Sequence, residues 1–263
     1  MTTDVLDGPK QVGQLIKEWR HRRRISQLDL SIEAGISTRH LSFVETGRSK
    51  PSSEMILKLS EFLSVPLRER NHLLLAGGYA PAYAEHALDA PEMAAARSAV
   101  REVLTAHEPY PALAVDRCWN IVDANGNVAL LTRGAAAYLR DGEVNALRLT
   151  LHPDGMAPYI VNHGQWRAHV LSALRRNAEA RADVDMLALY EELRDYPCDD
   201  RYAETDVPGA VHVPLILRVD DVQLSFLAII ATFGTALDIT LSELAIESFF
   251  PADAATAAYL RNA

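Results

Sequence analysis

The chain has 263 residues, of which 49% are apolar and 23% charged, a composition typical of one or two soluble globular domains. Its formal net charge of −9, taken over the whole length, argues against a nucleic-acid-binding protein. The charge is unevenly divided, however, because residues 1–80 carry 12 Lys and Arg against 9 Asp and Glu, whereas residues 81–263 carry 14 against 26. The excess of positive charge in residues 1–80 indicates that only this part of the chain has an anionic partner.

Lysine and cysteine usage narrows the possible chemistry further. The last lysine is Lys58, which excludes a Schiff-base lysine, a Walker-type phosphate loop and a Ser–Lys dyad from the rest of the chain. Cys118 and Cys198 have no metal-type spacing, and they are either small buried side chains or a redox pair. The first residues lack the apolar core of a signal peptide, and the longest apolar run, Leu224 to Phe233, is too short to cross a bilayer. We therefore expect a cytoplasmic protein with no membrane partner.

Residues 10–76 predict five short helices. Ser26 and Ser37 are suited to N-cap the second and third helices, and Gly35 and Gly47 stand where those helices should end. The short link through Gly35 is typical of a helix-turn-helix.

The same region resembles the Cro/repressor, or xenobiotic-response-element (XRE), type of helix-turn-helix. The residues that carry the resemblance are Ser26-Gln27-x-x-Leu30, Ala34-Gly35-Ile36-Ser37 and Leu41-Ser42-x-Val44-Glu45-x-Gly47-x-x-x-Pro51-Ser52. Ser31 departs from it, since the family usually has alanine there. The resemblance implies that the protein binds double-stranded DNA, and it places a buried ion pair at Arg20 and Glu45. The alternative is a helical bundle without DNA affinity, as in some antitoxins and interaction modules.

The resemblance also implies a role for each exposed residue of this region. The third helix would enter the major groove, and the expected base-reading residues are Thr38, Arg39, Ser42 and Phe43. The expected phosphate contacts are Gln27, Arg48 and Lys50. We expect a homodimer that binds a pseudo-palindromic operator with half-sites about one helical turn apart.

A connecting segment follows the helix-turn-helix. The sequence divides into a DNA-binding domain over 1–78, a linker over 79–109 with a helix from Pro91 onward, and a second domain over 110–263. The linker helix is either a dimerisation element or a plain spacer.

The second domain predicts an α+β fold with an antiparallel sheet. Its expected strands are Ala112–Asp116, Trp119–Val122, Val211–Val219 and Gln223–Thr232, and its expected helices are Asn125–Leu131, Gln165–Arg176 and Asp183–Leu193. Leu147 to Leu151 predicts a short strand or turn, and Thr240 to Glu243 predicts a capping box that opens a last helical turn. The opening of this domain, with an Asn-capped helix behind two strands, resembles a PAS domain.

Several stretches of the second domain resemble the MmyB-like ligand-binding domain, a family fused behind this type of helix-turn-helix. They are Trp119 with Asn125, Asn145 to Arg148, Leu151 to Gly155, Trp166, and Phe233 to Asp253. The resemblance implies a bacterial transcription regulator whose PAS-like domain senses a small, apolar or fatty-acid-like molecule. An enzyme is not expected, because the sequence has no nucleophile elbow, metal motif or dinucleotide loop; an antitoxin-like interaction module is the alternative.

A ligand would lie between the sheet and its covering helices. The large side chains expected to line that pocket are Trp119, Tyr138, Trp166, Tyr190, Phe226 and Phe233, and Arg148 and His152 are the candidates for a polar head group. Arg148 is equally expected to form an ion pair with an acidic residue of the fold instead. His152, His163, His169 and Asp154 have spacings that fit no metal motif, so neither a metal nor a cofactor is expected.

Overall fold

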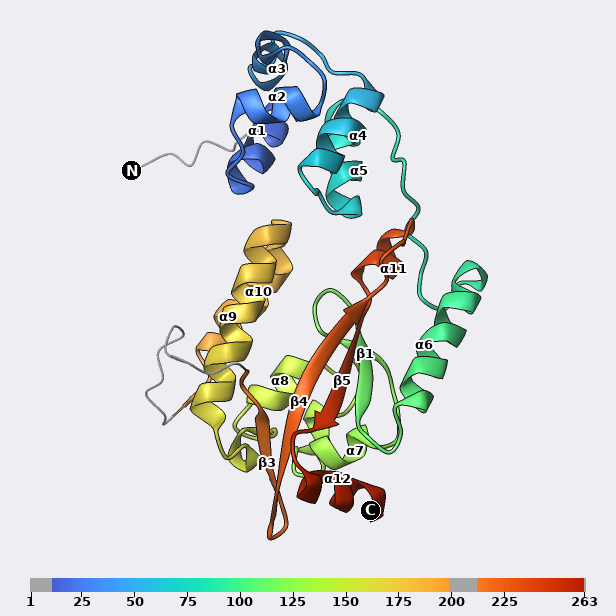
Figure 1. Ribbon diagram of the computed structural model, residues 1–263, viewed down its shortest axis with the longest axis vertical. Helices are drawn as coiled ribbons and strands as arrows, with labels where there is room; N and C mark the ends of the chain where they lie inside the picture. Colours follow the sequence, from blue (N-terminus) through green and yellow to red (C-terminus); the bar gives the residue numbers. More distant parts are fainter. Residues whose placement is uncertain (1–10, 199–211, 263) are drawn as a thin grey trace. The chain divides into compact units, whose positions relative to one another are not determined.

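The computed structural model of the protein describes residues 11–198 and 212–262, and these form two compact units (Figure 1). The first unit comprises the chain up to Glu85 together with Leu237–Ile239, and the second comprises His86–Ala236 and Thr240–Ala263. Across the described ranges, no helix is long and apolar enough to cross a membrane.

The first unit contains the five predicted helices. They are α1 (Val12–Arg22), α2 (Gln27–Glu33), α3 (Thr38–Glu45), α4 (Ser53–Phe62) and α5 (Leu67–Ala76). Each has an apolar face, and side chains from that face, such as Ile16, Leu30, Leu41 and Leu59, are almost fully buried. Burial of these faces offsets the conformational entropy that helices of this length lose on forming.

The helix boundaries follow from local chemistry. The hydroxyl oxygens of Ser26, Ser37 and Ser52 each accept a hydrogen bond from a backbone N–H in the first turn of α2, α3 and α4, respectively. Gly35 has a φ of +63°, a left-handed conformation that a side chain would strain, and it ends α2 in the predicted place. The helix-turn-helix prediction is thus confirmed down to its caps.

A buried ion pair joins α1 to α3. The guanidinium of Arg20 donates to both carboxylate oxygens of Glu45 at 2.7 and 2.9 Å, and it also donates to the carbonyl of Ile25. Gln27 donates a further hydrogen bond to Glu45 at 2.7 Å. Burial raises the pKa of Glu45, but the hydrogen bonds from Arg20 and Gln27 outweigh it and the pKa is lowered. Glu45 is therefore a carboxylate whose negative charge is neutralised within the fold.

The second unit is built on one five-stranded sheet, which is antiparallel as predicted. Its strands are β1 (Ala112–Val115), β2 (Ile121–Ala124), β3 (Leu215–Val219), β4 (Val222–Thr232) and β5 (Ala245–Pro251), in the order β2-β1-β5-β4-β3. The predicted hairpin turns at Asp220, which joins β3 to β4. Strand β5 was not predicted, although it occupies the centre of the sheet between β1 and β4.

Helices flank the sheet on both faces. The predicted linker helix consists of a short 3-10 turn (Pro91–Met93) and α6 (Ala94–Ala106), and it packs with Ala112, Ala114 and Ile246 on one face. The other helices are α7 (Val128–Thr132), α8 (Ala146–Leu151), α9 (His163–Arg181), α10 (Val184–Arg194), α11 (Ile239–Glu243) and α12 (Ala254–Asn262). The main core of the unit lies on the opposite face, where α7 to α10 contribute side chains to it.

Four local predictions in this unit were wrong. Asn125 does not cap a helix; its side chain is buried and bonds to the backbone of Leu104, Tyr110 and Ala112, while α7 begins at Val128. Residues 146–151 form a helix, α8, rather than a strand or turn, because Asn145 caps it. Trp119 lies in the turn before β2 with a φ of +68°.

The fourth error concerns Thr240. It lies inside α11 rather than capping it, and its hydroxyl donates to the carbonyl of His86. Long-range hydrogen bonds account for the conformations of Asn125 and Thr240, whereas the Asn145 cap of α8 is a local contact.

We predict that Arg20→Met lowers the free energy of unfolding of the first unit by about 3–5 kcal/mol, because it leaves Glu45 buried without its cation. The double variant Arg20→Met/Glu45→Leu should recover most of that loss. Amide hydrogen exchange across α1 to α3 measures both. Arg68→Met, which breaks the more exposed pair with Glu85, is the matched control and should cost about 1 kcal/mol or less. A single variant that is no less stable than the double variant would contradict the prediction.

Candidate functional site

The exposed face of α3 carries the four residues predicted to read bases. Arg39 is exposed, Thr38, Ser42 and Phe43 are half-buried, and the intervening Leu41, Val44 and Glu45 are buried. The guanidinium of Arg39 lies 5.3 Å from the centroid of the Phe43 ring, one helical turn further on. This cation–π contact orients Arg39 along the outer face of the helix.

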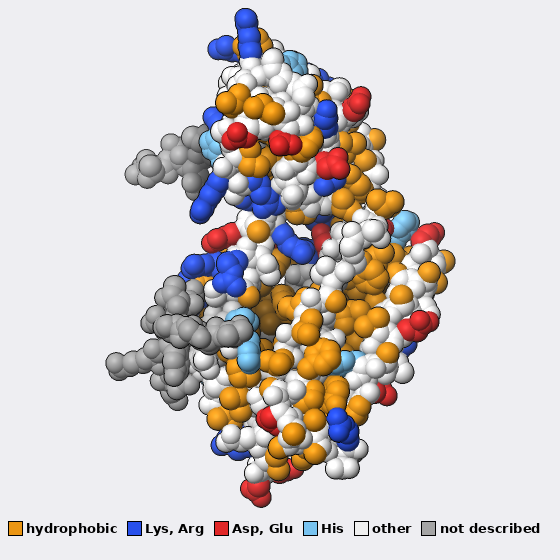
Figure 2. All heavy atoms as spheres, viewed as in Figure 1, with side chains coloured by type: hydrophobic (Ala, Val, Ile, Leu, Met, Phe, Trp, Pro, Cys, Tyr) orange, Lys and Arg blue, Asp and Glu red, His pale blue; other side chains and the backbone are white. Residues whose placement is uncertain are grey.

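The residues predicted to contact phosphate lie around the same helix. Gln27 is held by its hydrogen bond to Glu45, which fixes its side chain at the start of α2. Arg48 and Lys50 are exposed in the turn after α3, where Arg48 lies 5.9 Å from the Phe43 ring and Lys50 lies 5.1 Å from the Tyr79 ring. Figure 2 shows Lys and Arg side chains projecting from this unit. The arrangement places cations and polar groups on one helix and its flanks.

The unusual Ser31 is explained by a contact within the helix-turn-helix. Its hydroxyl donates to the carbonyl of Leu28 and shares a 2.9 Å hydrogen bond with the hydroxyl of Thr38, the first residue of α3. Alanine at this position would lack that bond, so the serine adds a polar tie between α2 and α3.

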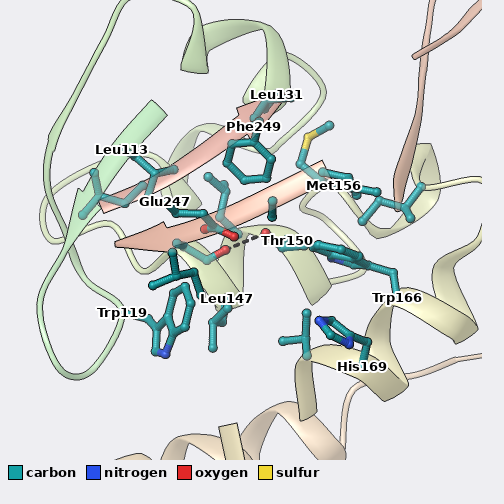
Figure 3. Close-up of a pocket in the computed structure, with 18 of the residues that line it drawn as sticks. Leu113, Trp119, Leu131, Leu147, Thr150, Met156, Trp166, His169, Glu247 and Phe249 are labelled. Carbon is teal, nitrogen blue, oxygen red and sulfur yellow. Dashed lines mark hydrogen bonds between the residues drawn. The ribbon is translucent and has the colours of Figure 1, made fainter. Parts of the chain in front are cut away.

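A cavity of about 150 Å³ lies in the second unit, between the sheet and helices α7, α8 and α9. Leu113, Phe249 and Ile230 from the sheet and Leu147 and Trp166 from the helices are among its apolar lining residues (Figure 3). Hydrophobic side chains gather over the strands of this unit in Figure 2. Ile230 is half exposed, so solvent reaches this part of the lining. The lining is mainly apolar, as is usual for small-molecule pockets.

Only two of the eight residues predicted for the pocket, Trp119 and Trp166, line this cavity. Tyr190 and Phe226 are buried in the core beside it, and Phe233 packs on the other face of the sheet, with the α6 cluster. Tyr138 is exposed, and its hydroxyl donates to Asp154.

The two predicted head-group residues also lie outside the cavity lining. Arg148 forms a bidentate pair with Glu192, with both nitrogen–oxygen distances at 2.7 Å, and the hydrogen bonds that it donates to this carboxylate raise the pKa of Arg148. His152 packs edge-on against Tyr196. Arg148 therefore ties α8 to α10, and its charge is already neutralised there.

Glu247 is the acidic residue in the cavity lining. It lies on the central strand β5, opposite Leu113 on β1 and Ile230 on β4, and all three line the cavity. Within the described part of the chain, no side chain or backbone group forms a hydrogen bond or ion pair with its carboxylate. Burial raises the pKa of Glu247 from 4.5 to about 7. Glu247 is half-buried, and its side chain borders the cavity (Figure 3).

The remaining polar groups of the lining are neutral. Thr150 on α8 donates to the carbonyl of Ala146 at 2.7 Å. Burial, aided by the positive charge of Arg176, lowers the pKa of His169 on α9, so this ring is uncharged at neutral pH. The indole nitrogen of Trp166 is fully buried and has no hydrogen-bond partner among the described residues.

The histidines and cysteines do not form a metal site in the part of the chain that the structure describes. His152 accepts a hydrogen bond from the backbone N–H of Asp154, and His163 lies 3.7 Å from the sulfur of Cys198. Burial raises the pKa of the Cys118 thiol to about 11, which keeps it protonated and disfavours redox reactivity.

Sequence reasoning missed Glu247, Thr150 and His169 as lining residues. A signal for Glu247 exists in the alternation of β5, where Ile246 and Ser248 face one side and Glu247 and Phe249 face the other. That signal is readable only once the segment is known to be a central strand, since an acidic residue otherwise indicates an exposed position.

Comparison with known proteins agrees with this geometry. Residues 96–263, more than half of the chain, match the family described as the MmyB-like transcription regulator ligand binding domain, and residues 16–70 match the helix-turn-helix family. A similar protein is the ImmF control region 10 kDa protein of Bacillus phage phi105. It is 32% identical over 63 residues, which cover 24% of this chain and 69% of the phage protein.

The raised pKa of Glu247 predicts a pH-dependent cost of folding. Between about pH 4.5 and pH 7 the Glu247 carboxyl group is ionised in the unfolded chain but still protonated in the folded protein. The free energy of unfolding of the wild type therefore falls as the pH rises through this range. Over that pH range the free energy of unfolding of the wild type should fall by up to about 3 kcal/mol more than that of Glu247→Gln. Urea unfolding of both proteins at several pH values measures this difference. His169 and Arg176 are common to both proteins and largely cancel in the difference. The control is Glu102→Gln, an exposed site on α6, whose free energy of unfolding should differ from that of the wild type by the same amount at every pH. The prediction is contradicted if the free energies of unfolding of wild type and Glu247→Gln run parallel across this pH range.

Proposed function

Because the chain belongs to the family of helix-turn-helix transcription regulators with an MmyB-like ligand-binding domain, we propose that a small apolar molecule in the cavity controls its binding to DNA. The protein is a DNA-binding transcription regulator, and both matched families are regulators rather than enzymes. The observation that carries the proposal is the apolar cavity itself, which lies within the matched ligand-binding domain. The phage protein that matches 63 residues of this chain carries "control region" in its name.

DNA recognition would use the exposed face of α3. The guanidinium of Arg39 is long and accessible enough to donate two hydrogen bonds to a guanine edge, and the Phe43 ring would pack against thymine methyl groups. Thr38 and Ser42 would supply shorter polar contacts. Arg48 and Lys50, with Gln27, would contact phosphates and set the register of the helix in the groove.

The protein would act as a homodimer on a pseudo-palindrome. One recognition helix of eight residues reads only a few base pairs, and two copies spaced by about one helical turn would extend the site. The net negative charge of residues 81–263 supports a division of labour in which the ligand-binding part stays off the DNA, because like charges repel.

The ligand-binding unit is proposed to be PAS-like. The strand order β2-β1-β5-β4-β3 and the helices α7 to α9 on the cavity side support this assignment. The ligand would be mainly apolar, to match the lining. A fatty-acid-like ligand, as the family resemblance implies, would bring a carboxylate to a lining that has no Lys or Arg among its described residues.

We predict that Arg39→Ala weakens binding to DNA from upstream of the protein's own gene by about 10- to 100-fold in a gel-shift titration, because one base contact is lost. Affinity should also fall steeply with salt, since phosphate contacts release counterions. Arg68→Ala is the matched control, because Arg68 on α5 pairs with Glu85, and it should leave affinity within about twofold. Equal affinities of wild type and Arg39→Ala would contradict the role given to α3.

A further inference from the structure

We propose that the cavity selects molecules that join a compact apolar group to a protonated amine, with the carboxylate of Glu247 binding the ammonium. This inference rests on the proposed function, because it names the ligand class of the same cavity. It departs from the fatty-acid expectation, since it reverses the sign of the ligand's charge.

Glu247 lies in the cavity without a polar partner among the described residues. Its strand neighbours on either side, Leu113 and Ile230, share the cavity face of the sheet and offer it no polar partner. Figure 3 shows the carboxylate pointing into the cavity among apolar side chains. An ionised carboxylate in such surroundings is costly unless it is paired, and within the described residues nothing pairs with it. A bound cation would complete the site.

The other polar groups of the lining are neutral and include hydrogen-bond acceptors that a cation could use. Thr150 has already donated its hydroxyl proton to Ala146, so the lone pairs of its oxygen remain to accept a hydrogen bond. His169, whose pKa is lowered by burial, is neutral at neutral pH, and like Thr132 and Asn177 it can accept as well as donate a hydrogen bond. The indole nitrogen of Trp166 is fully buried. The described lining thus holds one acidic group and no basic group that is charged at pH 7.

The aromatic lining favours the same kind of ligand. Rings of Trp119, Trp166 and Phe249 border the cavity, and the face of an aromatic ring attracts an ammonium group. A ligand carboxylate would instead meet the like charge of Glu247, or require that residue to stay protonated. A charge-assisted hydrogen bond between ammonium and carboxylate is about twice as strong as a neutral one.

The volume limits the apolar part of the ligand. A cavity of about 150 Å³ is of the size that holds a single aromatic ring in an apolar protein core. The half-exposed Ile230 leaves a route by which a longer alkyl chain would extend outward. A short alkyl or aryl amine is therefore the class of ligand that fits both the volume and the charge.

The test compares octylamine, 1-octanol and octanoate, which share a chain length and differ in charge, by isothermal titration calorimetry on the full-length protein at pH 7.5. We expect octylamine to bind at least about tenfold more tightly than 1-octanol, and octanoate to bind most weakly. Glu247→Gln should reduce the affinity for octylamine to that for 1-octanol and change the affinity for 1-octanol by no more than about twofold. Glu102→Gln, the matched exposed substitution on α6, should preserve the wild-type order.

A cavity-filling variant locates the binding. Ala173 lines the cavity from α9, so Ala173→Trp should remove the binding of all three compounds. The inference is overturned if 1-octanol or octanoate binds as tightly as octylamine, if Glu247→Gln keeps the preference, or if Ala173→Trp binds normally. Binding of 1-octanol without a preference for the amine overturns this inference alone, whereas no binding of any of the three compounds overturns the proposed function as well.

Discussion

The cost of burying a carboxylate shapes both units of this protein. Taking an ionised side chain out of water costs several kcal/mol unless a cation and hydrogen bonds replace the lost water. In the first unit, hydrogen bonds from Arg20 and Gln27 to the Glu45 carboxylate offset this cost, and the Arg20–Glu45 pair joins α1 to α3. In the second unit, Glu247 lies in an apolar cavity and the described fold supplies it with no such partner.

These two solutions match two different tasks. The proposed recognition helix, α3, has to present Arg39 and Phe43 in one orientation, and the ion pair of Glu45, at the end of α3, fixes that helix against α1. A sensor must instead gain stability when its ligand arrives. An unpaired carboxylate provides that gain, because a ligand that neutralises it binds the folded protein and not the unfolded chain. If Glu247 binds the ammonium of the ligand as proposed, the stability of the second unit depends on that ligand.

The sequence was sufficient for features that depend on neighbouring residues. The caps at Ser26 and Ser37 and the end of α2 at Gly35 lie where the sequence predicts them, because each involves contacts within a few residues. Features that depend on distant contacts were missed. Asn125 bonds to three backbone groups brought together by the fold, and β5 is recognisable only from its pairing with β1 and β4. The cavity lining could not be predicted for the same reason, since an acidic residue such as Glu247 indicates an exposed site until the sheet places it inside.

The most direct test of the central claim is the ionisation of Glu247 itself. In protein labelled with carbon-13 at the glutamate carboxyl, and with Glu247→Gln to assign the signal, the carboxyl resonance of Glu247 should titrate with a midpoint of about 7 in the free protein. Saturation with octylamine should shift that midpoint toward lower pH, because the bound ammonium favours the ionised form. A midpoint near the ordinary glutamate value in the free protein, or one that octylamine leaves unchanged, would contradict the account.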